Sequence, residues 1–216
     1  MELTKKEWWK VTFQTCMFAF RVITHPIEGM WELKHHKKNA FAASNIIMFL
    51  LCLLFMLRIQ MTGFIFASDR PEDVNIFFQV SSILVPVLAW TILNWSLTTL
   101  MDGKGKMVHV YIQTVYGLVP LFLLSIPQIL ISHFLTQGED AFYAMFGVIA
   151  MIWSLMLIIL GNMTVHDFTV SKTLIMAFFT IVAFISVCFL AMLFVNTIQQ
   201  LFNFFYTIYV ELSFAI

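Results

Sequence analysis

Long stretches of this chain carry no charged residue. Residues 74–101 contain none, and from residue 173 to the end the single charge is Glu211. About 20 consecutive apolar residues are the length of a helix that crosses a bilayer. A soluble domain has about 45–50% apolar and about 25% charged residues, whereas this chain has 61% hydrophobic and 11% charged residues. We therefore expect an integral membrane protein. A soluble enzyme, a disordered chain and an ordinary nucleic-acid-binding protein are excluded.

The uncharged runs predict five membrane-spanning helices, at residues 40–57, 74–101, 110–132, 141–165 and 173–195. The last run could continue, but residues 196–203 contain four amides, which are costly in the middle of a bilayer. We therefore expect the fifth span to end near Val195 and residues 196–216 to form an aromatic tail, interfacial or re-entrant. The predicted fold class is all-α, a polytopic membrane helix bundle of five transmembrane helices. It comprises an arm (1–39), a five-span domain (40–195) and the tail.

Lysines and arginines are divided unevenly between the two sides of this arrangement. Ten lie on the side of the amino terminus, seven of them before the first span, and only Arg58 and Arg70 lie on the other side. Basic residues favour the cytoplasmic side of a membrane. We therefore expect a multi-pass protein of the cell membrane with its amino terminus in the cytoplasm and its carboxyl terminus outside.

The arm is basic, and its polar and apolar residues fall on two different sides of a helix. Glu7, Lys10, Gln14 and Arg21 share one stripe, whereas Trp9, Phe13, Cys16 and Phe20, flanked by Trp8, lie on the other side. This pattern predicts an N-terminal amphipathic helix that ends at Thr24-His25-Pro26. Its apolar face suits the membrane interface, and equally suits packing on the protein's own spans.

Residues 102–106, Asp-Gly-Lys-Gly-Lys, join the second and third predicted spans. They lack the spacing of a phosphate-binding loop, so we expect a tight cytoplasmic turn in which the glycines supply positive φ. His109, His166 and Asp167 are expected near Asp102 at the same rim. A hydrogen-bonded cluster is favoured over a metal site, because no two histidines have the i, i+4 spacing of a preformed site. Neither a metal nor a cofactor is predicted.

The spans also carry no acidic residue and no recognisable nucleophile–base pair. We therefore expect neither an enzyme nor a proton-coupled pump. Two interpretations of the remaining intramembrane polar residues and prolines stay open. They suit helix–helix packing, and they suit a polar path through a channel or facilitator for a small neutral solute, lined by Asn94, Thr98, Thr99 and Tyr116 beside Pro86, Pro120 and Pro127.

Four motifs carry a family resemblance: His25-Pro26-x-x-Gly29 with Lys34, Asn94-Trp95 leading to Asp102-Gly-Lys104-Gly, Tyr116-x-x-x-Pro120, and His166-Asp167. Over residues 20–200 the chain resembles the bacterial branch of the Yip family, the Ypt-interacting proteins. The resemblance implies five spans and a cytoplasmic amino terminus. Eukaryotic relatives are non-enzymatic partners in vesicle traffic that bind small GTPases and reticulon-like proteins. Their acidic segment of the D-L-Y-G-P type is absent from this sequence.

Many bacterial relatives are encoded beside carbohydrate ABC importers. The resemblance therefore implies a non-catalytic accessory or scaffold protein, a partner subunit of a transport complex such as a carbohydrate ABC importer. Its expected partners are the lipid bilayer and another integral membrane protein, such as importer permease subunits, and no nucleic acid. The candidate docking or polar residues are Trp8, Trp9, Phe13, His25, Pro26, Gly29, Asn94, Asp102, Lys104, Tyr116, Pro120, His166 and Asp167.

Overall fold

The computed structural model describes residues 5–63, 66 and 75–214, and within these residues the chain is helical without a strand. The arm holds α1 (Lys5–Met17), α2 (Ala19–Thr24) and α3 (Pro26–His35). The rest consists of α4 (Ala40–Met61), α5 (Ile76–Leu100), α6 (Met107–Gly117), α7 (Val119–Ile131), the short 3-10 helix η2 (Gln137–Glu139), α8 (Asp140–His166) and α9 (Val170–Phe214). The predicted all-α class is confirmed.

Five helical segments are long and apolar enough to cross a membrane, counting α6 and α7 together. The shortest has 22 residues, about 33 Å at 1.5 Å per residue, which matches the hydrocarbon core of a bilayer. The first four segments begin and end within four residues of the predicted runs. The chain is thus a multi-pass membrane protein by the length and composition of its helices.

The third span is interrupted at Leu118, where α6 ends and α7 begins. The Leu118 N–H is shared between the carbonyls of Thr114 and Val115, at 3.1 and 3.2 Å. The cause is Pro120, whose ring has no N–H and crowds the carbonyl four residues earlier in a regular helix. Pro120 is buried at the second position of α7, where a missing N–H costs no helical hydrogen bond.

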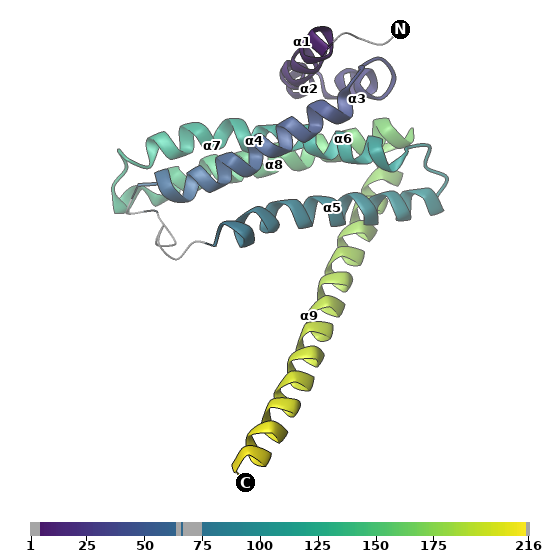
Figure 1. Cartoon of the computed structure of the whole chain (residues 1–216). Coiled ribbons are helices and arrows are strands. Elements are labelled where there is room, and N and C mark those ends of the chain that lie inside the picture. Colours follow the sequence, from purple (N-terminus) through teal and green to yellow (C-terminus); the bar gives the residue numbers. More distant parts are fainter. Residues whose placement is uncertain (1–4, 64–65, 67–74, 215–216) are drawn as a thin grey trace.

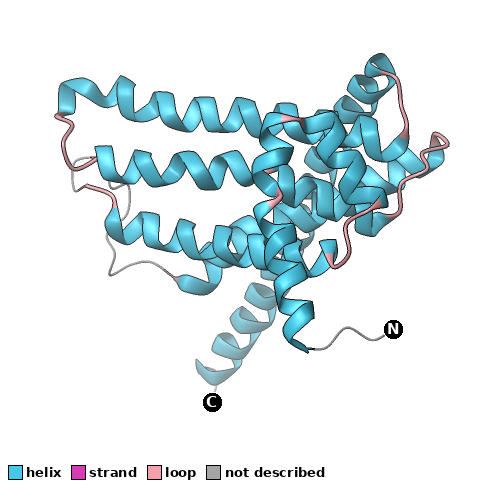
Figure 2. Cartoon of the chain, turned by 90° about the horizontal axis from the view of Figure 1, so that it is seen from above, coloured by secondary structure: helices cyan, strands magenta, loops and turns pink. Residues whose placement is uncertain are grey.

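Four spans lie side by side, with α4, α5 and α8 arranged around the α6–α7 span (Figure 1). Loops lie at both ends of this bundle (Figure 2). We call the end at which α4, α6 and α9 begin the arm end. The arm packs on the bundle there, with α1 against α4, α2 against α6, and α3 against α6 and α8.

The last helix, α9, behaves differently from the other spans. It has 45 residues and is about 67 Å long. Its first turns pack on α5 and α8 as far as the buried Thr180, and beyond this it leaves the bundle obliquely with most side chains exposed (Figure 1). The expected helix end near Val195 is not found. The segment contains no Gly or Pro, and the four amides leave the backbone hydrogen bonds of the helix intact.

Candidate functional site

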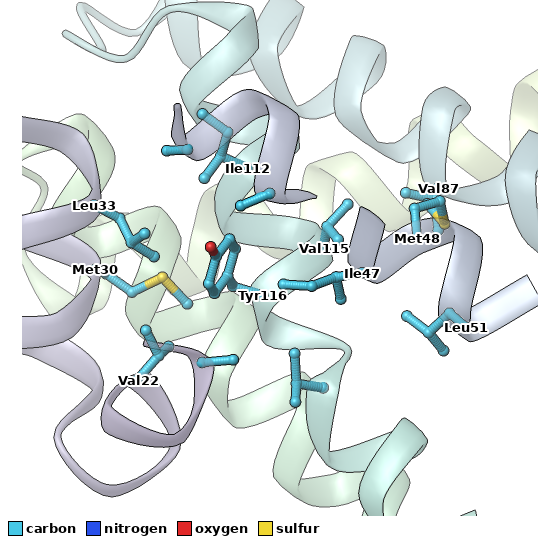
Figure 3. Packing of buried hydrophobic residues seen from close by; sticks show 14 of the residues in the cluster. Val22, Met30, Leu33, Ile47, Met48, Leu51, Val87, Ile112, Val115 and Tyr116 are labelled. Carbon is cyan, nitrogen blue, oxygen red and sulfur yellow. The ribbon is translucent and has the colours of Figure 1, made fainter. Parts of the chain in front are cut away.

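Tyr116 of α6 joins the arm to the bundle. Its side chain is fully buried, and its hydroxyl donates a hydrogen bond of 2.8 Å to the carbonyl oxygen of Thr15 in α1. Figure 3 shows the ring between Met30 of α3 on one side and Ile47 of α4 on the other. The aromatic ring supplies apolar contact area and the hydroxyl fixes one position of the arm backbone. Tyr116 is therefore an anchor for the arm rather than part of a polar path.

The His25-Pro26-x-x-Gly29 motif forms the turn between α2 and α3. His25 is exposed and ends α2, and Pro26 is the first residue of α3, where its fixed φ suits a helix start. Gly29 faces the preceding helix so closely that a Cβ there would lie 2.9 Å from Cα of Val22. The motif therefore lets two short helices pack backbone to backbone.

The arm presents two faces. The buried face holds Thr12, Thr15, Ala19 and Val22. It is bound to the bundle by the Tyr116 bond and by a 3.7 Å contact from the Cys16 thiol to the carbonyl of Ala43. Burial raises the pKa of this thiol above its ordinary value. The sequence left open whether the arm contacts lipid or packs on the protein's own spans. The structure shows that it packs on the spans, mainly through small and hydroxyl-bearing residues.

Trp9, Phe13 and Phe20 lie on the other face of the arm, whereas Phe18 packs against the core. Trp8 is half-buried, whereas Trp9, Phe13 and Phe20 are 56%, 66% and 55% exposed. The side chains of Trp9, Phe13 and Phe20 therefore contribute little to the docking on the bundle. An exposed aromatic face on a helix beside membrane spans suits contact with the lipid interface or with another protein.

The loop between α5 and α6 packs against the end of α8. Gly103 lies against the imidazole of His166 and the carbonyl of Thr98, and a Cβ at Gly105 would lie 2.6 Å from Cγ1 of Val165. The Gly105 N–H donates to Nδ1 of His166 at 3.3 Å. The expectation that glycines supply positive φ here is wrong: Asp102 takes the left-handed conformation, with φ of 60°. The glycines are needed because the backbone passes so close to α8.

Asp167 ties this loop to the arm. It ends α8 in the left-handed conformation, with φ of 56°. Its carboxylate oxygens lie 3.5 Å from Nζ of Lys34 in α3 and 3.5 Å from Nζ of Lys104 in the loop. Lys34 is nearly buried, with a side chain 10% exposed. Lys104, His166 and Asp167 therefore meet at the arm end with Lys34, which sequence reasoning noticed only as part of the family motif.

A small cavity, lined by both apolar and polar side chains, lies beneath this junction. It has a volume of about 10 Å³, roughly the space of one water molecule. Buried atoms of its lining, His109 Nδ1 and Gln113 Oε1, have no protein partner. Among the described residues, no three His, Cys, Asp or Glu side chains are placed to hold a metal ion.

Two polar pairs join helices within the bundle. Asn94 of α5 donates to Oγ1 of Thr180 in α9 at 3.2 Å, and Gln113 of α6 donates to Oδ1 of Asn162 in α8 at 2.6 Å. The second pair depends on Gly161, because a Cβ there would collide with Oε1 of Gln113. Sequence reasoning missed this pair, although Gln113 in a predicted span and the sequence Gly161-Asn162 were the available signals.

The residues expected to line a solute path do not face a common space. Thr98 is buried and its hydroxyl donates to the carbonyl of Asn94, whereas Thr99 is exposed on the outside of α5. A cavity of about 240 Å³ between α5, α6, α8 and α9 has an apolar lining that includes Pro86, Trp90 and Phe184. It contains none of the four residues of the expected path.

Comparison with known proteins gives one match. The sequence model of the Yip1 domain family matches residues 20–211, which extends from α2 almost to the end of α9. Searches of curated proteins and of solved structures gave no match. The match includes all four motifs on which the resemblance depended, and it does not distinguish a bacterial branch.

Proposed function

Because the chain belongs to the Yip1 domain family, we propose that it is a non-catalytic accessory or scaffold protein of the membrane. We further propose that it is a partner subunit of a transport complex, such as a carbohydrate ABC importer, in the cell membrane with its amino terminus in the cytoplasm. The distribution of Lys and Arg supports this orientation. The link to a transporter depends on the resemblance alone.

One observation carries the scaffold role: three polar side chains buried in the bundle bond to another helix. Asn94 and Gln113 each bond to a neighbouring helix, and Tyr116 bonds to the arm. Interhelical bonds of this kind hold spans in a fixed arrangement and leave fewer groups to bind a solute. The bundle therefore suits a stable platform better than a path.

The arm supplies the surface by which such a platform could bind a partner. Its docked face fixes it to the bundle, while Trp9 and Phe13 remain more than half exposed. Aromatic residues of this kind contribute most of the binding energy at many protein interfaces. We infer that the exposed face of α1 contacts the partner subunit at the membrane surface.

Isolation from native membranes tests the proposal. The tagged chain should co-purify with integral membrane transport subunits, and replacing Trp9 and Phe13 by Ser should reduce the recovered partner about tenfold. Phe49→Ser is a matched control, because Phe49 is 67% exposed on α4 but lies outside the arm. A protein that always isolates alone as a monomer would contradict the scaffold role.

The competing function, a facilitator for a small neutral solute, has a separate test. Purified protein in liposomes should give no solute flux above that of empty liposomes if the bundle is a scaffold. Flux that is lost on replacing Asn94 by Leu, with helical content unchanged, would favour the facilitator instead.

A further inference from the structure

The starts of α4 and α6 lie side by side at the arm end. The rings of Phe41 and Tyr111, each within the first two turns of its helix, are 5.7 Å apart between centroids. The Tyr111 hydroxyl donates to Oδ1 of Asn45 at 2.9 Å. Lys38 lies two residues before α4, and Lys106 lies one residue before α6. The two lysines therefore lie at the same end of these two helices, beyond the contact between the rings.

Lys38 and Lys106 carry charges that the described part of the chain does not neutralise. Both residues are exposed, and neither forms an ion pair with a described residue. Segments 34–38 and 102–106 together contain five lysines and one aspartate. The carboxylate of Asp167 already lies between two other lysines of these segments. This surface therefore has an excess of positive charge and suits an anionic ligand.

The outer side of α4 next to this surface is apolar, with one polar side chain in it. Phe41 and Phe49, one turn to either side of Asn45, are 51% and 67% exposed. Asn45 is also exposed. Its oxygen accepts from Tyr111, whereas its amide nitrogen has no acceptor among the described residues. A polar N–H on a face that contacts lipid needs an acceptor, and a lipid that binds here can supply one.

The position of the lysines in the chain also indicates a lipid. Clusters of about four to eight Lys and Arg next to a membrane span are typical of proteins that bind anionic lipids. Segment 34–38 ends two residues before the first span, and segment 102–106 ends where the third span begins. The basic surface is thus continuous with a face of the spans that the chain itself leaves uncovered.

A phospholipid with a net negative charge fits these features together. Its phosphate oxygens accept from ammonium groups, its ester oxygens accept from an amide, and its acyl chains match exposed phenylalanines. We propose that Lys38 and Lys106 bind the phosphate of an anionic phospholipid, with Asn45 bonded to an ester oxygen and the acyl chains along the outer side of α4. A zwitterionic lipid binds less well, because the same lysines repel its ammonium group.

Lipid binding to the full-length chain in detergent micelles tests this site. Native mass spectrometry counts the lipids bound when dioleoyl phosphatidylglycerol or dioleoyl phosphatidylcholine, which have the same acyl chains, is added at equal concentrations. The unmodified chain should bind phosphatidylglycerol about tenfold more tightly than phosphatidylcholine. Lys38→Gln combined with Lys106→Gln should lower the affinity for phosphatidylglycerol about tenfold and change that for phosphatidylcholine less than about twofold.

Arg21→Gln combined with Lys10→Gln is the matched control. It removes the same charge from exposed positions of the arm, where Arg21 is already paired with Glu32 at 2.8 Å. The affinity for phosphatidylglycerol should change less than about twofold, because the contribution of a charge at the membrane surface falls off within a Debye length. Lys38→Arg combined with Lys106→Arg keeps the charge and should keep the preference for phosphatidylglycerol.

Asn45→Leu separates the ester contact from the charge. It should weaken the binding of both lipids about threefold, the effect of one lost hydrogen bond, and leave the preference between them unchanged. Circular dichroism without added lipid should be the same for all these variants, since the replaced lysines form no ion pair within the described residues.

Four results would overturn the proposal. Equal affinity of the unmodified chain for the two lipids would exclude a charge-selective site. Undiminished binding of phosphatidylglycerol by the variant lacking Lys38 and Lys106 would place the lipid elsewhere. An equal loss in the control variant would indicate attraction by overall charge. Complete competition by glycerol phosphate would show that phosphate alone is recognised. None of these measurements requires a transporter, so the proposed scaffold role is tested separately.

Discussion

One tyrosine of the third span, Tyr116, holds the arm in place on the bundle. Tyr116 has no exposed surface, and its hydroxyl reaches the Thr15 carbonyl from a different helix. A buried tyrosine of this kind contributes by its apolar ring and by one directed hydrogen bond. The two contributions can be separated, because phenylalanine keeps the ring and removes the bond.

We predict that Tyr116→Phe lowers the free energy of unfolding by about 1 kcal/mol, the typical net loss for one buried hydrogen bond. Amide hydrogen exchange in residues 12–24 should become faster, while exchange in α8 stays unchanged. Tyr111→Phe is the control, because the Tyr111 hydroxyl bonds to Asn45 at an exposed position and its loss should cost less than about 0.5 kcal/mol. Equal effects of the two substitutions would show that the arm is not held by Tyr116.

Gly161 illustrates a different residue-scale effect, since its missing side chain makes room for Gln113. Gly161→Ala should push the Gln113 amide away from Asn162 and lower the free energy of unfolding by about 1–3 kcal/mol. Gly138→Ala should have no comparable effect, because nothing lies within 4 Å of its Cβ position. Thermal unfolding in detergent measures both. If Gly161→Ala combined with Gln113→Ala is no more stable than Gly161→Ala alone, the collision is not the cause.

Helices α1 and α2 have one face that is docked on the bundle and one exposed face that carries aromatic residues. The docked face should determine stability, and the aromatic face should not. Replacing Val22, which has no exposed surface, by Ser should lower the free energy of unfolding by about 2 kcal/mol. Replacing both Trp9 and Phe13 by Ser should change it by less than about 0.5 kcal/mol. Circular dichroism at 222 nm during denaturation reports both. A large loss from the Trp9 and Phe13 pair would mean that the aromatic face is docked.

The spans could be predicted because uncharged runs of more than 20 residues have few other structures available to them. The docking of the arm could not be predicted, because lipid and a neighbouring helix stabilise an amphipathic helix equally well. The helix end near Val195 was expected from the cost of amides in lipid, but that cost acts on side chains and does not break backbone hydrogen bonds. The role of Gly103 and Gly105 depends on the position of His166, about 60 residues later in the chain, and no local pattern contains it.

For the whole molecule, the distribution of basic residues predicts an orientation that labelling can check. In a chain without native cysteines, Gly138→Cys should react with a membrane-impermeant maleimide in intact cells, and Lys106→Cys should react only after permeabilisation. Gly105 is unsuitable for this test, since a side chain there would meet Val165, whereas Lys106 is exposed. The reverse labelling pattern would place the amino terminus outside.

The bond between Tyr116 and Thr15 also sets an order of events during synthesis. The two residues are separated by 101 positions, so at about 5–20 residues per second the ribosome needs about 5–20 s to reach Tyr116 after Thr15. Until then, α1 and α2 have no third span to pack on, whereas the membrane surface is already available to Trp9 and Phe13. The arm can therefore pack on α4, the first span, before its bond to the third span forms, and that bond closes only after the third span has been made.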